Sequence, residues 1–247
     1  MTTSFALRSL VCVLWLCRLS ALAQKECGTE VKLLLLPSQA QSAVRSFHAG
    51  KSVRGEVYFF DTPTLELLSQ GIIVRVRKGA TSDLTVKLRP SPDKEIRSVS
   101  GRHAKVKCEL DLTGGTAIRS YSIQSQLNAA VPESGKEILA MLNTAQKNLL
   151  VQVHSAIDWT QVKRVAEIKS TDWPIYSQPK FPKLVMELWE WPTGSIFELS
   201  TKVSHDTSPT AYTDLQRLAA AKGLSLSSQQ KSKTTLVLEE LAHVTVP

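Results

Sequence analysis

Apolar and polar residues alternate with a period of two along most of the chain, a pattern typical of strands that bury one face. Turn-forming residues separate the alternating segments, for example Gly114 with Gly115 and Pro192 with Gly194. The alternation predicts eight strands, at residues 30–36, 55–60, 72–78, 84–88, 105–112, 162–170, 184–191 and 195–203.

Three helices are expected between the strands. Thr62 and Pro63 give one helix an N-cap and a first-turn proline, and Gly71 ends it. Apolar residues at helical spacing predict the others at 134–151 and 208–223. Many strands and few helices indicate an α+β fold. We expect an eight-stranded antiparallel β-barrel with a few flanking helices, with a sandwich as the alternative.

The first 23 residues have the three parts of a cleavable export signal. Arg8 supplies a positive charge, residues 9–17 are apolar, and Ala21 and Ala23 form the small-x-small cleavage pattern. An uncleaved anchor or a buried first helix is the alternative, although the apolar run is short for a membrane span. We therefore expect a secreted or periplasmic protein with one domain at residues 24–247 and no stable membrane span.

Charge and cysteine content refine this picture. The formal net charge of +8 drops to +6 when Arg8 and Arg18 leave with the signal, which favours anionic partners. Cys27 and Cys108 are then the remaining cysteines, and two cysteines in an exported protein indicate one disulfide. Two buried free thiols are the alternative.

Charged residues recur at every second position of several strands and so share a face. The groups are Arg75 with Arg77, Lys87 with Arg89, Lys107 with Glu109 and Asp111, Lys169 with Lys163 and Glu167, and Glu198 with Ser200 and Lys202. A solvated sheet face would explain this pattern. A closed barrel lined by the same charges would instead bind a polyanion, and its acidic residues could hold a hard divalent cation.

Several segments resemble the CYTH domain, the triphosphate tunnel metalloenzyme family. The most specific is residues 58–77, YFFDTPTLELLSQGIIVRVR, which is similar to the family's YFDTP…L…G…LRxR block. Shorter matches follow in the family's order over nearly the whole mature chain, at residues 84–87, 107–111, 196–200 and 232–233.

The resemblance implies a tunnel in which basic side chains bind a triphosphate and carboxylates bind Mg²⁺ or Mn²⁺. The expected anion-binding residues are Lys32, Arg75, Arg77, Lys87, Arg89, Lys107, Lys169 and Lys233. The expected metal ligands are Glu30, Glu109, Asp111 and Glu198.

The first strand departs from the family's ExExK motif. Glu30 is kept, but Lys32 stands where the second glutamate is expected and Leu34 where the lysine is expected. Ser200 also replaces a glutamate of the late strand. Because a cation repels a metal ion, these changes predict weakened metal binding.

Three functions fit the sequence. The first is a metal-dependent phosphohydrolase, of low activity, acting on an inorganic or organic triphosphate or polyphosphate. The second is a non-catalytic secreted tunnel that binds a polyanion, and the third is an interaction module. The tryptophans are assigned to packing, so nucleic acid is not an expected partner. The sequence assigns no catalytic residue, substrate identity or oligomeric state.

Overall fold

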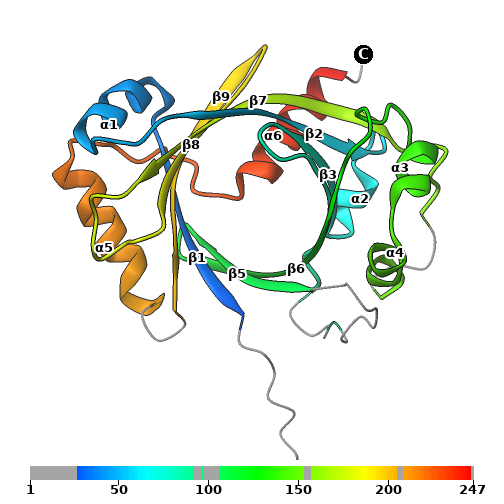
Figure 1. The fold of residues 1–247 in the computed structure, drawn as a ribbon, viewed down its shortest axis with the longest axis horizontal. Coiled ribbons are helices and arrows are strands. Elements are labelled where there is room, and N and C mark those ends of the chain that lie inside the picture. The colour runs from blue at the N-terminus through cyan, green and yellow to red at the C-terminus, as the bar shows by residue number, and fades with distance from the viewer. Residues whose placement is uncertain (1–26, 92–95, 97–105, 153–156, 205–207, 246–247) are drawn as a thin grey trace, which may run out of the picture.

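The computed structural model describes residues 27–91, 96, 106–152, 157–204 and 208–245. In this part of the chain, nine strands form a closed barrel in the order β1-β5-β6-β4-β3-β2-β7-β8-β9 (Figure 1). The strands are β1 (Gly28–Leu35), β2 (Val53–Asp61), β3 (Ile72–Lys78), β4 (Asp83–Leu88), β5 (Lys107–Thr113), β6 (Thr116–Gln126), β7 (Lys163–Ile175), β8 (Leu184–Trp191) and β9 (Gly194–Val203). The predicted export signal lies outside the described residues.

The predicted α+β barrel is confirmed, but the prediction that it has eight strands, all antiparallel, is wrong in two respects. A ninth strand, β6, follows β5 through a tight turn in which Gly114 and Gly115 have φ of 60° and 78°. Such positive φ angles favour glycine. Strands β1 and β5 also pair in parallel, with Glu30 opposite Asp111, so the barrel is mixed.

Six α-helices and a short 3-10 helix, η1 (Pro37–Gln39), accompany the barrel in the described segments. The α-helices are α1 (Ala40–Ser46), α2 (Glu66–Ser69), α3 (Gly135–Met141), α4 (Thr144–Val151), α5 (Ser208–Ala221) and α6 (Lys233–Thr245). The single helix expected at 134–151 is two helices, because Asn143 begins a new one by accepting a hydrogen bond from the backbone of Gln146.

Apolar side chains lie mainly outside the barrel wall, under the helices. Val74, Val76 and Val86 pack with Ile138 and Leu149 of α3 and α4. On another side of the wall, β1, β8 and β9 pack against α1 and α5. Figure 1 shows these two helix pairs on opposite outer sides. The wall is therefore stabilised from outside, which leaves much of its inner face to polar residues.

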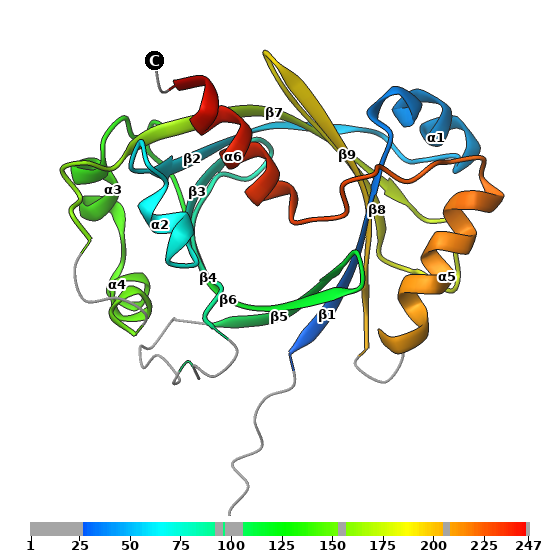
Figure 2. The ribbon, with the colours of Figure 1, turned by 180° about the vertical axis from the view of Figure 1, so that it is seen from behind.

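Helix α6 covers one end of the barrel. Its Val237 and Leu238 pack against Phe59, Ile168 and Trp189. Figure 2 shows α6 and the segment that precedes it in front of the barrel opening. Gln230 of this segment fixes it to β1, because its side chain accepts a hydrogen bond from Leu34 N and donates one to Leu34 O.

The predicted disulfide between Cys27 and Cys108 is confirmed. Their sulfurs are bonded and their Cα atoms are 4.7 Å apart, within the normal range for disulfides. The bond joins the chain just before β1 to the start of β5. No helix in the described ranges is both long enough and apolar enough to span a membrane.

Candidate functional site

The inner face of the barrel carries the cations of β3 and β4. Because Val74, Val76 and Val86 face the outer helices, the alternate residues Arg75, Arg77 and Lys87 point inward. Arg89, directly after β4, lines the same interior cavity as Arg75 and Lys87.

A cavity of 260 Å³ occupies the interior beneath the start of α6, and we refer to this part as the covered end. Six basic and two acidic residues line it among the described part of the chain. They are Lys32, Arg75, Lys87, Arg89, Lys231 and Lys233, with Asp111 and Glu198. The cavity wall therefore has a formal charge of +4, together with threonine hydroxyls that can donate hydrogen bonds.

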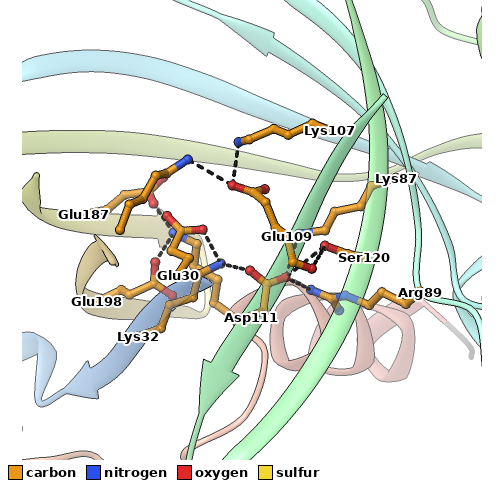
Figure 3. A network of polar contacts seen from close by, with 12 residues as sticks. Glu30, Lys32, Lys87, Arg89, Lys107, Glu109, Asp111, Ser120, Glu187 and Glu198 are labelled. Atoms are coloured by element: carbon orange, nitrogen blue, oxygen red, sulfur yellow. Dashed lines mark hydrogen bonds and ion pairs between the residues drawn. The ribbon is translucent and has the colours of Figure 1, made fainter. Parts of the chain in front are cut away.

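Lys32 lies at the centre of the acidic residues (Figure 3). Its Nζ is 2.9 Å from Asp111 Oδ1 and 3.1 Å from Glu30 Oε2. Burial alone would lower the pKa of Lys32, but the carboxylates of Glu198, Glu30 and Asp111 outweigh it and raise that pKa. Lys32 is therefore a permanent cation in the tunnel.

Asp111 is shared by several cations. Its Oδ2 lies 2.7 Å from Lys87 Nζ and 3.9 Å from Arg89 Nη2, while Oδ1 accepts from Lys32. Burial would raise the pKa of Asp111, but Lys32 and Lys87 hold it well below its usual range. One carboxylate thus neutralises only part of the charge around it.

Lys233, at the start of α6, forms a second ammonium centre. Its Nζ is paired with Glu187 and lies 2.9 Å from Glu198 Oε1, and it sits 4.4 Å from the ring centroid of Trp189. These acids outweigh the effect of burial and raise the pKa of Lys233. The contacts place the first turn of α6 inside the barrel.

Two arginines of the cavity retain unused donors. Arg75 forms no ion pair or hydrogen bond with any described residue, and Nε of Arg75 and of Arg89 is buried without a partner. Burial, together with the neighbouring Arg77, lowers the pKa of Arg75 to about 10. Unpaired buried donors are costly, so an anion in the cavity would stabilise both side chains.

The opposite part of the tunnel, which we refer to as the open end, is electrostatically different. Arg77 Nε lies 2.8 Å from Asp83 Oδ2, and Glu109 Oε1 lies 2.6 Å from Lys107 and 3.0 Å from Lys202. These three basic side chains are 42–53% exposed. Asp83 compensates Arg77, whereas Lys107 and Lys202 share Glu109, so each of the three has an acidic partner within the protein.

The residues expected to bind a metal ion do not fit a divalent cation. Glu30, Glu109, Asp111 and Glu198 all face the interior, but each is paired with a lysine. The described residues contain no group of three His, Cys, Asp or Glu side chains arranged to hold a metal. The donor set is that of ammonium ions bound to carboxylates.

Lys169 is the one expected anion-binding residue that lies outside the barrel, while Arg77 and Lys107 lie at the open end of the tunnel. Lys169 is exposed, and it lies opposite Glu56 on the face of the sheet that carries Tyr58, outside the barrel. The inner face of β7 instead carries Ala166 and Ile168, because α6 packs there.

The sequence interpretation also left out residues that contribute to the interior. Asp83, Asp172, Lys202 and Lys231 were not assigned, although their charges act on the tunnel. Lys202 lies four residues after Glu198 on β9 and so shares its face of the strand, which indicated that Lys202 also points inward. Lys231 lies outside any strand, so alternation gave no signal.

Comparisons with known proteins extend this description. No family model matches the sequence, and no curated protein matches it. Solved structures match its fold, among them the following two. One is a proposed adenylyl cyclase of Hippeastrum, HpAC1, described as having a dominant triphosphatase activity, with 17% identity and a TM-score of 0.59 over 85% of this chain and 95% of that chain. The other is a proposed adenylate cyclase of Bacillus halodurans, with 14% identity and a TM-score of 0.56 over 85% and 97%.

This chain has the fold of the CYTH, or triphosphate tunnel, proteins. The recognition made from residues 58–77 is therefore confirmed at the level of the fold. Identities this low establish the architecture alone, so the activity of the neighbours enters only as support for a proposal.

Proposed function

We propose that this protein binds a triphosphate or longer polyphosphate chain in the cavity at the covered end. The observation that carries the proposal is the surplus of cations around the cavity: six basic residues face two carboxylates, and Arg75 has no partner among the described residues. A small, strongly charged anion is the ligand that such a cavity favours.

The types and positions of the donors support this choice. Arginine presents a planar fork of N–H donors that pairs with two phosphate oxygens at once, and Arg75 and Arg89 both have a free Nε. Lys87, Lys231 and Thr235 lie around them in the same cavity. The volume of 260 Å³ falls just below that of pockets for drug-sized molecules, which suits a compact anion.

Binding is favoured over metal-dependent hydrolysis as the main function. Hydrolysis of a phosphoanhydride requires stabilisation of developing charge and an activated water, which metal ions commonly provide. In this chain the carboxylates that would hold such ions are bound to lysines. The triphosphatase activity described for the Hippeastrum protein keeps hydrolysis as a second candidate.

A secreted or periplasmic location is part of the proposal. Its support is the disulfide between Cys27 and Cys108, since such bonds persist in oxidising compartments. N-terminal sequencing of the protein exported by a secreting host tests it. A product beginning at or near Gln24 supports the proposal, whereas a membrane-bound product that retains Met1 contradicts it.

Calorimetry with inorganic triphosphate at fixed ionic strength tests the binding site. Arg75→Glu should weaken binding by at least about 100-fold, because it removes charge-assisted hydrogen bonds worth about 1.5–3 kcal/mol and adds repulsion. Arg54→Glu is the matched control, because Arg54 is an exposed residue of β2. Arg75→Gln provides the same test with less disturbance of the fold. Equal losses for Arg75 and Arg54 variants would indicate a diffuse basic surface and refute the proposed cavity.

The second candidate is tested by phosphate release from tri- and polyphosphates, with and without Mg²⁺ or Mn²⁺. We expect release near background in every condition. Brisk metal-dependent turnover by the natural protein would establish the hydrolase instead.

A further inference from the structure

Lys32 and Lys233 together contact four of the interior carboxylates. Lys32 contacts Glu30 and Asp111, and Lys233 contacts Glu187 and Glu198. Figure 3 shows the four carboxylates gathered around one region of the tunnel. The two ammonium groups therefore occupy the space that hard cations would need, and both also line the cavity proposed for the anion.

The contacts of these lysines make them difficult to displace. Their side chains are only 12–16% exposed, so an ammonium pushed away from its carboxylates would remain largely desolvated. A divalent ion entering here would also lie within a few ångströms of a positive charge that cannot leave. Coulomb repulsion over such distances is strong in a partly buried site. Two effects therefore oppose metal binding. The carboxylates are already paired with the lysines, and the ammonium groups repel a divalent cation.

Alternation along β1 explains the geometry at Lys32. Glu30 and Lys32 are two residues apart and share the inner face, and β1 pairs with β5 in parallel, with Glu30 opposite Asp111. This register brings an acid of the neighbouring strand to Lys32. Lys233 arrives from a different direction, on the first residue of α6.

We infer that Lys32 and Lys233 act as built-in counter-ions in place of divalent metal ions, so that the protein takes the metal-free form of the polyanion. This inference rests on the proposed function and specifies its ligand. Each ammonium group lies beside the cavity as a fixed positive charge. The protein therefore provides the charge neutralisation of the phosphates that dissolved divalent cations would otherwise provide. Mg²⁺ then competes with the protein, because it binds the same free triphosphate in solution.

The test is calorimetry of the full chain with inorganic triphosphate, in EDTA and in excess Mg²⁺ at equal ionic strength. The affinity should be at least as high in EDTA, and should fall about ten-fold or more in Mg²⁺ when most of the ligand is chelated. Binding that requires Mg²⁺, or is tightened by it, overturns the inference. The absence of binding in both conditions refutes the proposed function instead.

A charge-reversal variant sharpens the test. In Lys32→Glu the new carboxylate would join Glu30 and Asp111, so we expect binding in EDTA to fall at least ten-fold and to recover when Mg²⁺ is added. Lys32→Met removes the charge without adding a ligand, so its binding should fall and should not recover. Lys169→Glu is the matched control, an exposed lysine of a strand on the outer face, and should behave as the natural protein does.

A readout without triphosphate completes the design. Mn²⁺ alone should leave the thermal midpoint of the natural protein unchanged and raise that of Lys32→Glu, because a ligand specific for the folded state stabilises it. A clear Mn²⁺-induced rise in the natural protein would show that its carboxylates do accept metal and would overturn the inference. If Lys32→Glu does not fold, the inference is tested by triphosphate binding to Lys32→Met and by the effect of Mn²⁺ on the thermal midpoint of the natural protein.

Discussion

The covered and open ends of the tunnel differ in how their cations are compensated. At the covered end, the side chains of Lys32, Lys87 and Arg89 are 14–16% exposed and all contact Asp111, with Glu30 as a second partner of Lys32. At the open end, Arg77, Lys107 and Lys202 are 42–53% exposed, and each has an acidic partner close by. A basic residue on the inner face is therefore not by itself a ligand-binding residue. The covered end differs in also holding Arg75 and Lys231, which have no acidic partner among the described residues, whereas each of the three basic residues at the open end contacts a carboxylate.

The largest expected effect concerns the disulfide beside the open end. Replacing Cys27 and Cys108 by serine should lower the free energy of unfolding by about 4.5 kcal/mol, from the closure entropy of a loop with a sequence separation of 81 residues. Urea unfolding measures the loss, with the reduced natural protein as the control. Triphosphate affinity of the folded variant should stay within two-fold, and a loss at the cavity would show that the two ends are coupled.

Lys233→Met tests the pairing at the covered end. It leaves Glu187 and Glu198 with an uncompensated buried charge, so the free energy of unfolding should fall by about 3 kcal/mol. Lys231→Met is the control, since Lys231 is exposed, lines the same cavity and forms no ion pair with a described residue. Its unfolding free energy should change by less than about 0.5 kcal/mol. Equal losses in urea unfolding would mean that the ion pairs of Lys233 contribute no stability.

A pair of neutral variants compares the arginines of β3 directly. Arg75→Gln should weaken triphosphate binding by about 30-fold, the equivalent of about 2 kcal/mol for lost charged hydrogen bonds. Arg77→Gln should change it by less than about three-fold, because Asp83 compensates Arg77 and exposed charges are screened. Calorimetry measures the triphosphate affinity of both variants. A larger loss of affinity for Arg77→Gln than for Arg75→Gln would place the ligand at the open end.

The smallest expected effect is on pH dependence. Burial lowers the pKa of Lys87 to about 8, in spite of the carboxylate of Asp111. The ammonium therefore loses its proton as the pH rises from 7 to 9, and affinity for the anion should fall by up to about ten-fold over that range. Lys87→Arg stays charged and should show only the change that the ionisation of triphosphate itself produces. Identical pH profiles would exclude Lys87 from the site.

Alternation predicted that Arg75 and Arg77 share one face of their strand and that Lys87 and Arg89 share one face of theirs, and the resemblance to the CYTH family implied that these faces point inward. Their apolar alternates are valines and leucines, and period-two alternation needs no long-range information. The same rule fails at Lys169. Over the first half of β7 the inner face carries Ala166 and Ile168 and packs against α6, so Glu167 and Lys169 point outward, whereas Asp172 further along the strand acts on the tunnel. Alternation identifies the two faces, but the packing partners decide which one is inside.

The features that sequence reasoning missed depend on distant parts of the chain. Strand β6 has the sequence TAIRSYSIQSQ, and its small polar residues give little hydrophobic signal, because one face lines the tunnel. The parallel pairing of β1 with β5 joins segments about 80 residues apart. The contact of Lys32 with Asp111 arises from that pairing, and the contact of Lys233 with Glu198 arises from the packing of α6 against the barrel. Residue types were therefore predictable, but their partners were not.

The position of β1 between β5 and β9 has a consequence for the order in which the barrel is assembled. This strand is synthesised first among the nine, yet one of its two neighbours ends only at Val203. Partial chains can pair β1 with β5, but the ring of strands closes only after nearly the whole domain has been made. Closure that depends on such distant pairing slows folding, because the entropy of the intervening chain is lost first. A premature stop before β9 would therefore leave an open sheet with two unpaired edges, and such edges favour aggregation. The Cys27–Cys108 bond can form earlier, and it would hold one of those edges in register while the rest of the chain arrives.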